Sequence, residues 1–322
     1  MGELQLIDSF LRPFGLSRER AERNASATGV VAGPGDDCAV LAPTRGQRLV
    51  ATTDAVVDGV HFDLRRCTPE DAGHKALAVN LSDLAAAGAR PRWFLCALGV
   101  PLRARDQEQV AARMGRGMAR LARAHGCALV GGNVTAAKEW SLTITALGEA
   151  ARPLSRSGGR AGDLLIVAGL LGEAALGLRK GAPASALRAQ RRPQPLVAAG
   201  LLAARSASAS IDVSDGLLRD LEHLARASGC GATIECRDLP LGPAARRHRD
   251  GVKLALSGGE DYALLLAASA RRAAPLLRAL HKVRVPAAII GSLTHRKGLR
   301  LLDGGVAIAL PSTLGWDHLR DL

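Results

Sequence analysis

Acidic residues stand beside glycines, at the ends of predicted strands and, in one case, within a very apolar predicted helix of this basic chain. They are Asp36, Asp37, Asp54, Asp83, Asp212, Asp215, Glu260 and Asp261. A carboxylate in apolar surroundings is costly unless it is paired or bound to a metal. Mg²⁺ prefers oxygen ligands, usually one or two carboxylates together with phosphate oxygens and water. The pattern therefore indicates magnesium ligands.

Each motif also has a simpler structural interpretation. Asp36 and Asp37 could form an Asx turn, and Asp54 could cap the segment that follows it. Asn80 and Asp83 share a helix face and could be a satisfied buried polar pair. Ser214 or Asp215 could be a helix N-cap, and the stretch SGGED (257–261) could be only a hairpin turn. The presence of five such elements in one chain favours a common site.

The common nucleotide-binding motifs are absent from the sequence. There is no GxxxxGK[ST] stretch, no HRD or DFG set, and no GxGxxG after a predicted strand. If ATP binds, its phosphates must be held mainly by metals and acids. Two unit charges about 4 Å apart repel by roughly 4 kcal/mol at an effective dielectric constant near 20, so phosphoryl transfer between phosphates requires cations between them.

The composition excludes several classes of protein. The 322 residues carry a net charge of +13, but the arginines are scattered and aromatic residues make up only 2%, which argues against a nucleic-acid binder. No apolar run is long enough to span a membrane, and we expect no secretory signal. The six cysteines show no zinc-type spacing, so we expect buried thiols in a reducing cytoplasm.

Strand and helix patterns alternate along both halves, which predicts a mixed α/β class. We expect helices at 3–25, 71–88, 105–125 and 173–179 and one opening at Asp215-Gly216, and strands at 38–41, 48–53, 93–100, 128–130, 141–149, 163–168, 210–213, 253–256 and 262–267. The stretch ARPLSRSGGR (151–160) indicates a boundary between domains at 1–150 and 151–322.

Eight blocks of the sequence, taken in order, resemble the thiamine-monophosphate kinase family. They are GPGDDCAVL (33–41), TTDAVVDGVHF (52–62), KALAVNLSDLAAAGARP (75–91), GGNVT (131–135), SRSGGRAGD (155–163), IDVSDGLLRDL (211–221), SGGEDYALL (257–265) and GWDHL (315–319). The similarity runs from about residue 30 to the C-terminus. The GVHF and GWDH elements favour this family over the related aminoimidazole ribonucleotide synthetases, selenophosphate synthetases and hydrogenase maturation factors.

The resemblance implies a fold and an activity. It implies two α/β domains, with the N-terminal sheets of a homodimer closing into a barrel. It implies direct, in-line transfer of the γ-phosphate of ATP to thiamine monophosphate, with Mg²⁺ and without a phosphorylated enzyme. The N-terminal domain would bind ATP and Mg²⁺ and form the dimer, and the C-terminal domain would complete the site.

The resemblance also implies roles for individual residues. The implied magnesium ligands are Asp36, Thr52, Thr53, Asp54, Asp83, Asn133, Asp212 and Asp215. The implied ATP contacts are Gly132, Asn133, Arg156 and Ser214. The implied contacts to thiamine monophosphate are His61, Glu260 and Trp316. For His61 and Trp316, a purely structural role is the alternative.

One position departs from the family pattern. The usual GGDTT is GGNVT here, so Asn133 stands where a metal-binding aspartate is expected. An asparagine offers a carbonyl oxygen but no charge. Two alternatives therefore stand beside the kinase: a related ATP-using enzyme acting on another substrate, and a weakened or non-catalytic paralogue.

Overall fold

The computed structural model describes residues 3–16, 29–34 and 36–316. The chain divides into two compact units, which are described separately below. The first comprises residues 1–84 and 90–151, and the second comprises residues 85–89 and 152–322. No helix in the described part of the chain has both the length and the hydropathy to cross a membrane.

A four-stranded sheet is the centre of the first unit. Its order is β3-β6-β4-β5, where β4 and β5 are parallel and the other pairs are antiparallel. The strands are β3 (Arg48–Val57), β6 (Ser141–Ala150), β4 (Arg90–Pro101) and β5 (Ala128–Ala137). A separate two-stranded ribbon joins β1 (Val30–Ala32) and β2 (Val40–Leu41).

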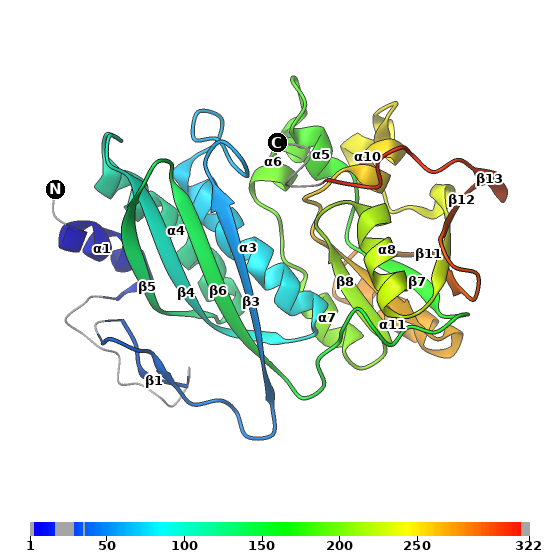
Figure 1. Cartoon of the computed structure of the whole chain (residues 1–322), viewed down its shortest axis with the longest axis horizontal. Coiled ribbons are helices and arrows are strands. Elements are labelled where there is room, and N and C mark those ends of the chain that lie inside the picture. Colours follow the sequence, from blue (N-terminus) through cyan, green and yellow to red (C-terminus); the bar gives the residue numbers. More distant parts are fainter. Residues whose placement is uncertain (1–2, 17–28, 35, 317–322) are drawn as a thin grey trace. The chain divides into compact units, whose positions relative to one another are not determined.

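Two helices, α3 (Pro69–Ala86) and α4 (Gln107–His125), lie on one face of this sheet (Figure 1). They pack closely through Gly73 and Gly117, because a Cβ at either position would collide with backbone of the other helix. Glu70 adds salt bridges to Arg113 and Arg116 across the pair. The two helices are therefore held close together on this face of the sheet.

The structure corrects two expected elements of the first unit. The helix expected over 3–25 ends as α1 (Glu3–Leu11), followed by the 3₁₀ turn η1 (Arg12–Phe14), because Pro13 lacks the N–H that would continue the ladder. Residues 17–25 lie outside the described part. The strand expected at 128–130 does not stop at Gly131 but continues to Ala137, because parallel pairing with β4 carries it on.

A seven-stranded sheet is the centre of the second unit. Its order is β13-β12-β9-β11-β7-β10-β8, antiparallel throughout except for the pair β12 and β9. The strands are β7 (Leu164–Ala168), β8 (Ala209–Val213), β9 (Gly231–Glu235), β10 (Ala263–Ala268), β11 (Ala287–Thr294), β12 (Leu299–Asp303) and β13 (Val306–Ile308). Every residue of β10 is buried, which explains its unbroken apolar sequence.

Helices of the second unit shield this sheet. They are α5 (Glu173–Gly177), α6 (Ala184–Arg191), α7 (Val197–Ala203), α8 (Leu217–Ala227), α9 (Pro243–Arg247), α10 (Gly251–Ser257) and α11 (Ala270–Lys282), with the 3₁₀ turn η2 (Cys236–Asp238). The apolar stripe of α8, including Leu217, Leu221 and Leu224, packs in one core cluster with Ile211 and Leu265 of the sheet. This packing fixes α8 against β8, the strand that precedes it.

The strand expected at 253–256 is wrong, because these residues belong to helix α10. The short apolar run KLAL fits either structure, and its leucine and alanine favour a helix. The stretch SGGED therefore connects a helix to β10 and is not a hairpin turn between two strands.

Candidate active site

Three sequence-distant motifs meet through their main chains in the second unit. The N–H of Tyr262 donates to the carbonyl of Val213 at 2.8 Å, and the N–H of Glu260 donates to Ser214 at 2.7 Å. The N–H of Trp316 donates to the carbonyl of Asp215 at 2.9 Å. The stretches IDVSDG, SGGEDY and GW thus form one continuous surface at the end of β8.

Two glycines permit this close approach. A Cβ at Gly259 would lie 2.6 Å from the carbonyl oxygen of Ser214. A Cβ at Gly315 would collide with the carbonyl of Asp215. Because backbone atoms cannot move aside as a flexible side chain does, both positions require the absence of a side chain.

The SGGEDY stretch has strained backbone on both sides of Asp261. Glu260 has φ of 67° and Tyr262 has φ of 49°, values in the left-handed region. Such residues cost of order 1–3 kcal/mol each and persist only where surrounding contacts impose them. The Glu260 carboxylate accepts a hydrogen bond from Gln190 of α6 at 3.2 Å. Gln190 is a residue that the sequence did not single out.

Asp261 anchors this strained loop to the start of α5. Its carboxylate accepts the N–H of Gly172 at 2.7 Å and that of Ala174 at 3.3 Å. Burial of the carboxyl group, assisted by the charges of Glu173 and Glu260, raises the pKa of Asp261 to about 7. The protonated form of this side chain is therefore favoured by folding.

Asp261→Asn is expected to flatten the dependence of stability on pH. The folded-state pKa lies above the ordinary value of 3.8, so the contribution of Asp261 is fully present below about pH 4 and is lost as the pH rises through about 7. Relative to the variant, the native chain should lose up to about 4 kcal/mol of unfolding free energy across this window. Urea denaturation at several pH values measures it. The exposed Asp238→Asn variant is the control, and parallel curves for Asp261→Asn and the native chain would contradict the assignment.

The two acids of IDVSDG differ in their surroundings. Asp212 is only 5% exposed and lies opposite Leu264 in the sheet. The Asp215 side chain is about one-third exposed and lies 3.8 Å from the guanidinium of Arg219. The N-cap of α8 is Gly216, without a side-chain cap, so neither Ser214 nor Asp215 caps this helix. The simpler interpretation of these two residues as caps is thereby removed.

Asp220 fixes the loop that carries Ser214 and Asp215. From the first turn of α8, its carboxylate accepts the N–H of Ser214 at 3.0 Å and that of Asp215 at 3.1 Å. Burial raises the pKa of Asp220 to about 7, with a further contribution from the charge of Asp215. Asp220 is not among the residues predicted from the sequence, although its spacing of five from Asp215 in DGLLRD was a usable signal.

Asp220→Ala is expected to lower the free energy of unfolding by about 2–4 kcal/mol, because it leaves two loop N–H groups without their acceptor. Asp220→Asn keeps one acceptor oxygen and should cost less than half as much. Urea denaturation measures both effects, with the exposed Asp238→Ala variant as control. Equal stability of Asp220→Ala and the control would show that the loop does not depend on this carboxylate.

Arg156 lies beside the same helix. Its carbonyl accepts the hydroxyl of Ser228 at 3.0 Å. Burial, followed by the charges of Arg156 and Arg219, lowers the pKa of His223 on α8. Arg219 in turn donates to the carbonyl of Trp316 at 2.5 Å, and Trp316 is 41% exposed. Arg219 therefore lies beside both Asp215 and Trp316, and both Arg156 and Arg219 lie close to His223.

In the first unit, Thr52 and Asp83 form the closest pair among the expected ligands. The hydroxyl of Thr52 on β3 donates to the Asp83 carboxylate on α3 at 2.5 Å. Alternation along β3 places Asp54 on the same face as Thr52. These oxygen donors lie at the edge strand, where Asp54 is exposed and Asp83 is half-buried.

The strand register places the other expected ligands of this sheet on two different faces. Gly132 pairs with Cys96 and shares the helix-covered face with Asp54, whereas Asn133 pairs with Ala97 on the opposite face. Thr53 also lies on that opposite face, and its hydroxyl is 3.0 Å from the carbonyl of Ile144. The side chains of Thr53 and Asn133 therefore do not share a face with Asp54.

Asn80 is not part of a satisfied polar pair. It is fully buried on α3, and its amide nitrogen donates to the carbonyl of Ala76 at 3.0 Å. Its side-chain oxygen has no hydrogen-bond partner among the described residues. The interpretation of Asn80 and Asp83 as a mutually satisfied pair is wrong.

His61 forms hydrogen bonds within its own turn and with a buried lysine. Its Nδ1 accepts the N–H of Val57 at 3.2 Å, which places the ring proton on Nε2 when the ring is neutral. The Nζ of Lys75, a residue only 1% exposed, donates to the carbonyl of His61 at 2.8 Å. Lys75 is not among the residues predicted from the sequence, although a lone lysine in the apolar run KALAVNL was a usable signal for this contact.

Asp36 is exposed, and its carboxylate accepts the N–H of Asp37 at 2.9 Å. This bond reaches only the next residue, one short of an Asx turn. Across the described ranges, no group of three or more His, Cys, Asp and Glu side chains is arranged to hold a metal ion. Within the described part of each unit, the side chains alone therefore do not form a complete metal site, and further ligands would have to come from a bound phosphate or from water.

Two family models match the chain in consecutive parts. The model for the AIR synthase related protein, N-terminal domain, covers residues 35–150, and the model for the corresponding C-terminal domain covers residues 160–304. Together with the two sheets and the acidic motifs, they define a two-domain α/β protein of the AIR synthase related class.

Comparison with individual proteins identifies the family within this class. The chain is 35% identical to the thiamine-monophosphate kinase of Salmonella typhimurium over 332 aligned positions, with 98% of each chain covered. The crystal structure of the Stenotrophomonas maltophilia enzyme of that name has a TM-score of 0.81 at 35% identity, covering 96% of this chain and 98% of that one. AaThiL complexed with AMPPCP and TMP has a TM-score of 0.75 at 28% identity, covering 98% and 97%. The chain belongs to the thiamine-monophosphate kinase family.

Proposed function

We propose that this protein transfers the γ-phosphate of ATP to thiamine monophosphate and releases thiamine diphosphate and ADP. The observation that carries the proposal is the junction in the second unit, where main-chain hydrogen bonds join Glu260 to Ser214 and Trp316 to Asp215. A predicted ATP contact and a predicted metal ligand thereby lie next to two predicted substrate contacts. A relative solved with AMPPCP and TMP supports the same pair of substrates.

The donor set fits Mg²⁺. Thr52, Asp54 and Asp83 offer hydroxyl and carboxylate oxygens in the first unit, and Asp212 and Asp215 offer carboxylates in the second. One or two carboxylates per ion, with phosphate and water completing the shell, is the usual magnesium arrangement in proteins. When bound, the metal neutralises phosphate charge. We assign Asp36, Thr53 and Asn133 to the same set on the resemblance of their motifs.

The remaining residues bind and orient the substrates in this proposal. Arg156 holds ATP phosphate oxygens by its guanidinium fork, and Gly132 and Ser214 contact the nucleotide. Trp316 stacks on the aromatic rings of thiamine monophosphate, of which the thiazolium is cationic, and the tryptophan is 41% exposed. Glu260 and His61 contact the same substrate. Positioning and charge neutralisation supply most of the rate enhancement, without a protein nucleophile.

We also propose a cytoplasmic homodimer in which residues 1–150 bind ATP and Mg²⁺ and form the dimer, and residues 151–322 complete the active site. The open face of the four-stranded sheet supports this, because Thr53, Ala97, Asn133 and Thr143 are exposed there. Pairing two such sheets into a barrel would remove their edges. Light scattering of the full chain tests the dimer.

The activity is tested by incubating the full chain with ATP, thiamine monophosphate and Mg²⁺, with separation of thiamine diphosphate and ADP by chromatography. Product should form only when all three are present, and EDTA should abolish it. ATP turnover that is indifferent to thiamine monophosphate would instead identify an ATP-using enzyme with another substrate. Folded protein that binds both substrates without turnover would identify a non-catalytic paralogue.

Asn133→Asp is expected to lower the Mg²⁺ concentration required for half-maximal activity, because it adds a charged ligand at the position where the family pattern has aspartate. The product should be unchanged. Steady-state rates at increasing Mg²⁺ measure the effect, with Asn133→Ala as the comparison. An unchanged requirement in both variants would remove residue 133 from the ligand set, in keeping with its location on the face opposite Asp54.

A further inference from the structure

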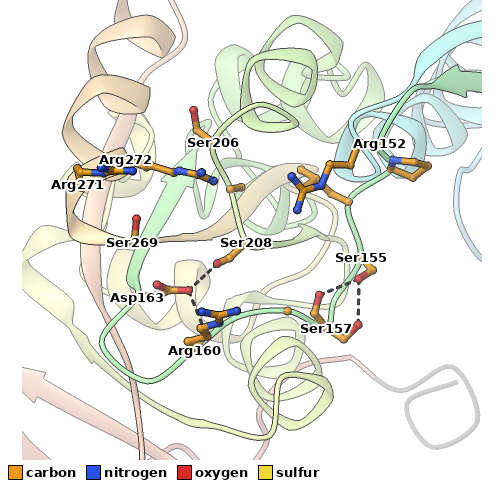
Figure 2. A pocket seen from close by; sticks show the side chains of 14 residues that line it. Arg152, Ser155, Ser157, Arg160, Asp163, Ser206, Ser208, Ser269, Arg271 and Arg272 are labelled. Carbon is orange, nitrogen blue, oxygen red and sulfur yellow. Dashed lines mark hydrogen bonds between the residues drawn. The ribbon is translucent and has the colours of Figure 1, made fainter. Parts of the chain in front are cut away.

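A cavity of about 580 Å³ lies within the second unit, apart from the junction described above. Three segments line it: residues 152–160, the loop 206–208 before β8, and residues 269–272 at the start of α11 (Figure 2). Neither Arg156 nor Ser214, the predicted ATP contacts of this unit, lines it. The cavity is therefore a feature that the proposed kinase site does not use.

The lining is strongly basic. It contains Arg152, Arg160, Arg271 and Arg272, and we name it the arginine cavity after them. The one acid of the lining is Asp163, whose carboxylate accepts the N–H of Arg160 at 3.0 Å and the hydroxyl of Ser208 at 2.6 Å. The Asp163 carboxylate is thus hydrogen-bonded to neighbouring groups of the lining.

The four guanidinium groups form no ion pair or hydrogen bond with any other described residue. Arg152 and Arg272 extend toward one another from opposite sides of the cavity (Figure 2). Like charges that face one another repel, so this arrangement is favourable when an anion lies between them. Many exposed arginines in the described part of this basic chain lack an ion pair, so the feature that sets these four apart is that they line one cavity together.

Further polar groups face the same space. Ser269 precedes α11, and its hydroxyl makes no capping bond. The hydroxyl of Ser206 likewise has no hydrogen bond to the described residues. Both can donate to a bound anion, and the N-terminus of α11 adds positive potential.

The lining also restricts the ligand. No aromatic residue lines the cavity, so it has no stacking platform for a base. A guanidinium binds phosphate oxygens in a two-pronged fork, and two opposed guanidinium groups can each take one phosphate. We propose that the arginine cavity binds the diphosphate group of a small molecule, with Arg152 and Arg272 as the principal contacts and Arg160 and Arg271 adding charge.

Calorimetric titration of the full chain with sodium pyrophosphate, in EDTA and at low salt, tests this proposal. EDTA removes metal-dependent phosphate binding at the proposed kinase site, and the variants of the cavity arginines, which leave Arg156 intact, separate the arginine cavity from the direct contact of Arg156. Saturable binding is expected, and the Arg152→Gln/Arg272→Gln double variant should weaken it by about tenfold or more. The double variant should retain its rate of ATP turnover, since neither arginine belongs to the proposed kinase machinery.

Arg278→Gln/Arg300→Gln is the matched control. It removes the same charge from two exposed arginines of the second unit that do not line the cavity, and it should change the affinity by less than about twofold. Circular dichroism verifies that each variant is folded, and Arg272→Glu alone provides a second variant. Absence of pyrophosphate binding at millimolar concentration, or equal weakening in both double variants, would overturn the proposal.

ADP and thiamine diphosphate, titrated under the same conditions, distinguish the possible sources of the group. Tighter binding of either than of pyrophosphate would identify that compound as the better ligand. Equal binding of all three would identify the diphosphate group alone as the recognised element. In each case the binding must weaken in Arg152→Gln/Arg272→Gln. Loss of kinase activity and loss of this binding are separate measurements, so either proposal can fail without the other.

Discussion

Asp54→Ala is expected to reduce ATP-dependent phosphorylation of thiamine monophosphate by at least about 10²- to 10³-fold, the range typical of losing one group that stabilises transition-state charge. Asp54 is exposed on edge strand β3 and shares a face with Thr52, whose hydroxyl contacts Asp83. Removing this carboxylate takes a charged oxygen donor from the proposed magnesium site, and the fold should not suffer because the side chain is not in the core.

The decisive comparison measures rate and stability together. Asp63→Ala is the control, since it also removes one carboxylate from the first unit, where Asp63 forms a surface salt bridge with Arg65. Both variants should unfold at nearly the same urea concentration as the native chain, and only Asp54→Ala should lose activity. A rate for Asp54→Ala close to that of Asp63→Ala would exclude Asp54 from the site.

Gly132→Ala is expected to lower the free energy of unfolding by about 3 kcal/mol or to prevent folding altogether. Gly132 pairs with Cys96 across parallel strands β5 and β4. A Cβ there would lie against the Cys96 carbonyl, closer than the 3.0 Å limit that real Cβ atoms respect. Both atoms belong to paired strands, so relief would require edge strand β5 to separate from β4.

The adjacent glycine provides a matched control for this substitution. At Gly131 an added Cβ would meet Cδ2 of Leu95 at 2.9 Å, and the end of a leucine side chain can rotate away. Gly131→Ala should therefore cost clearly less than Gly132→Ala in urea denaturation. Equal losses would mean that the effect comes from alanine in the strand and not from the Cys96 carbonyl. Gly132 is thus required by sheet packing, whatever its contact with ATP.

Local sequence was sufficient for the elements with long, regular patterns. The helices α3 and α4 and the strands β4, β6 and β10 lie where their apolar periodicity predicted them. Local sequence gave the wrong structure for the short run KLAL, which is helical. It also gave the wrong end for β5, which extends seven residues beyond Val130. In both cases the outcome depends on neighbours that a local pattern does not contain, namely the packing of α10 and the pairing of β5 with β4.

The acids, their glycines and their order along the chain were readable from the sequence, because residue type and family pattern are local properties. Only the tertiary structure joined Ser214 to Glu260 and Asp215 to Trp316, pairs about 45 and 100 positions apart, through main-chain hydrogen bonds. Only the strand register separated Asn133 from Asp54. The physical reason is that hydrogen bonding and sheet register are set by pairs of distant segments, and neither segment alone specifies its partner.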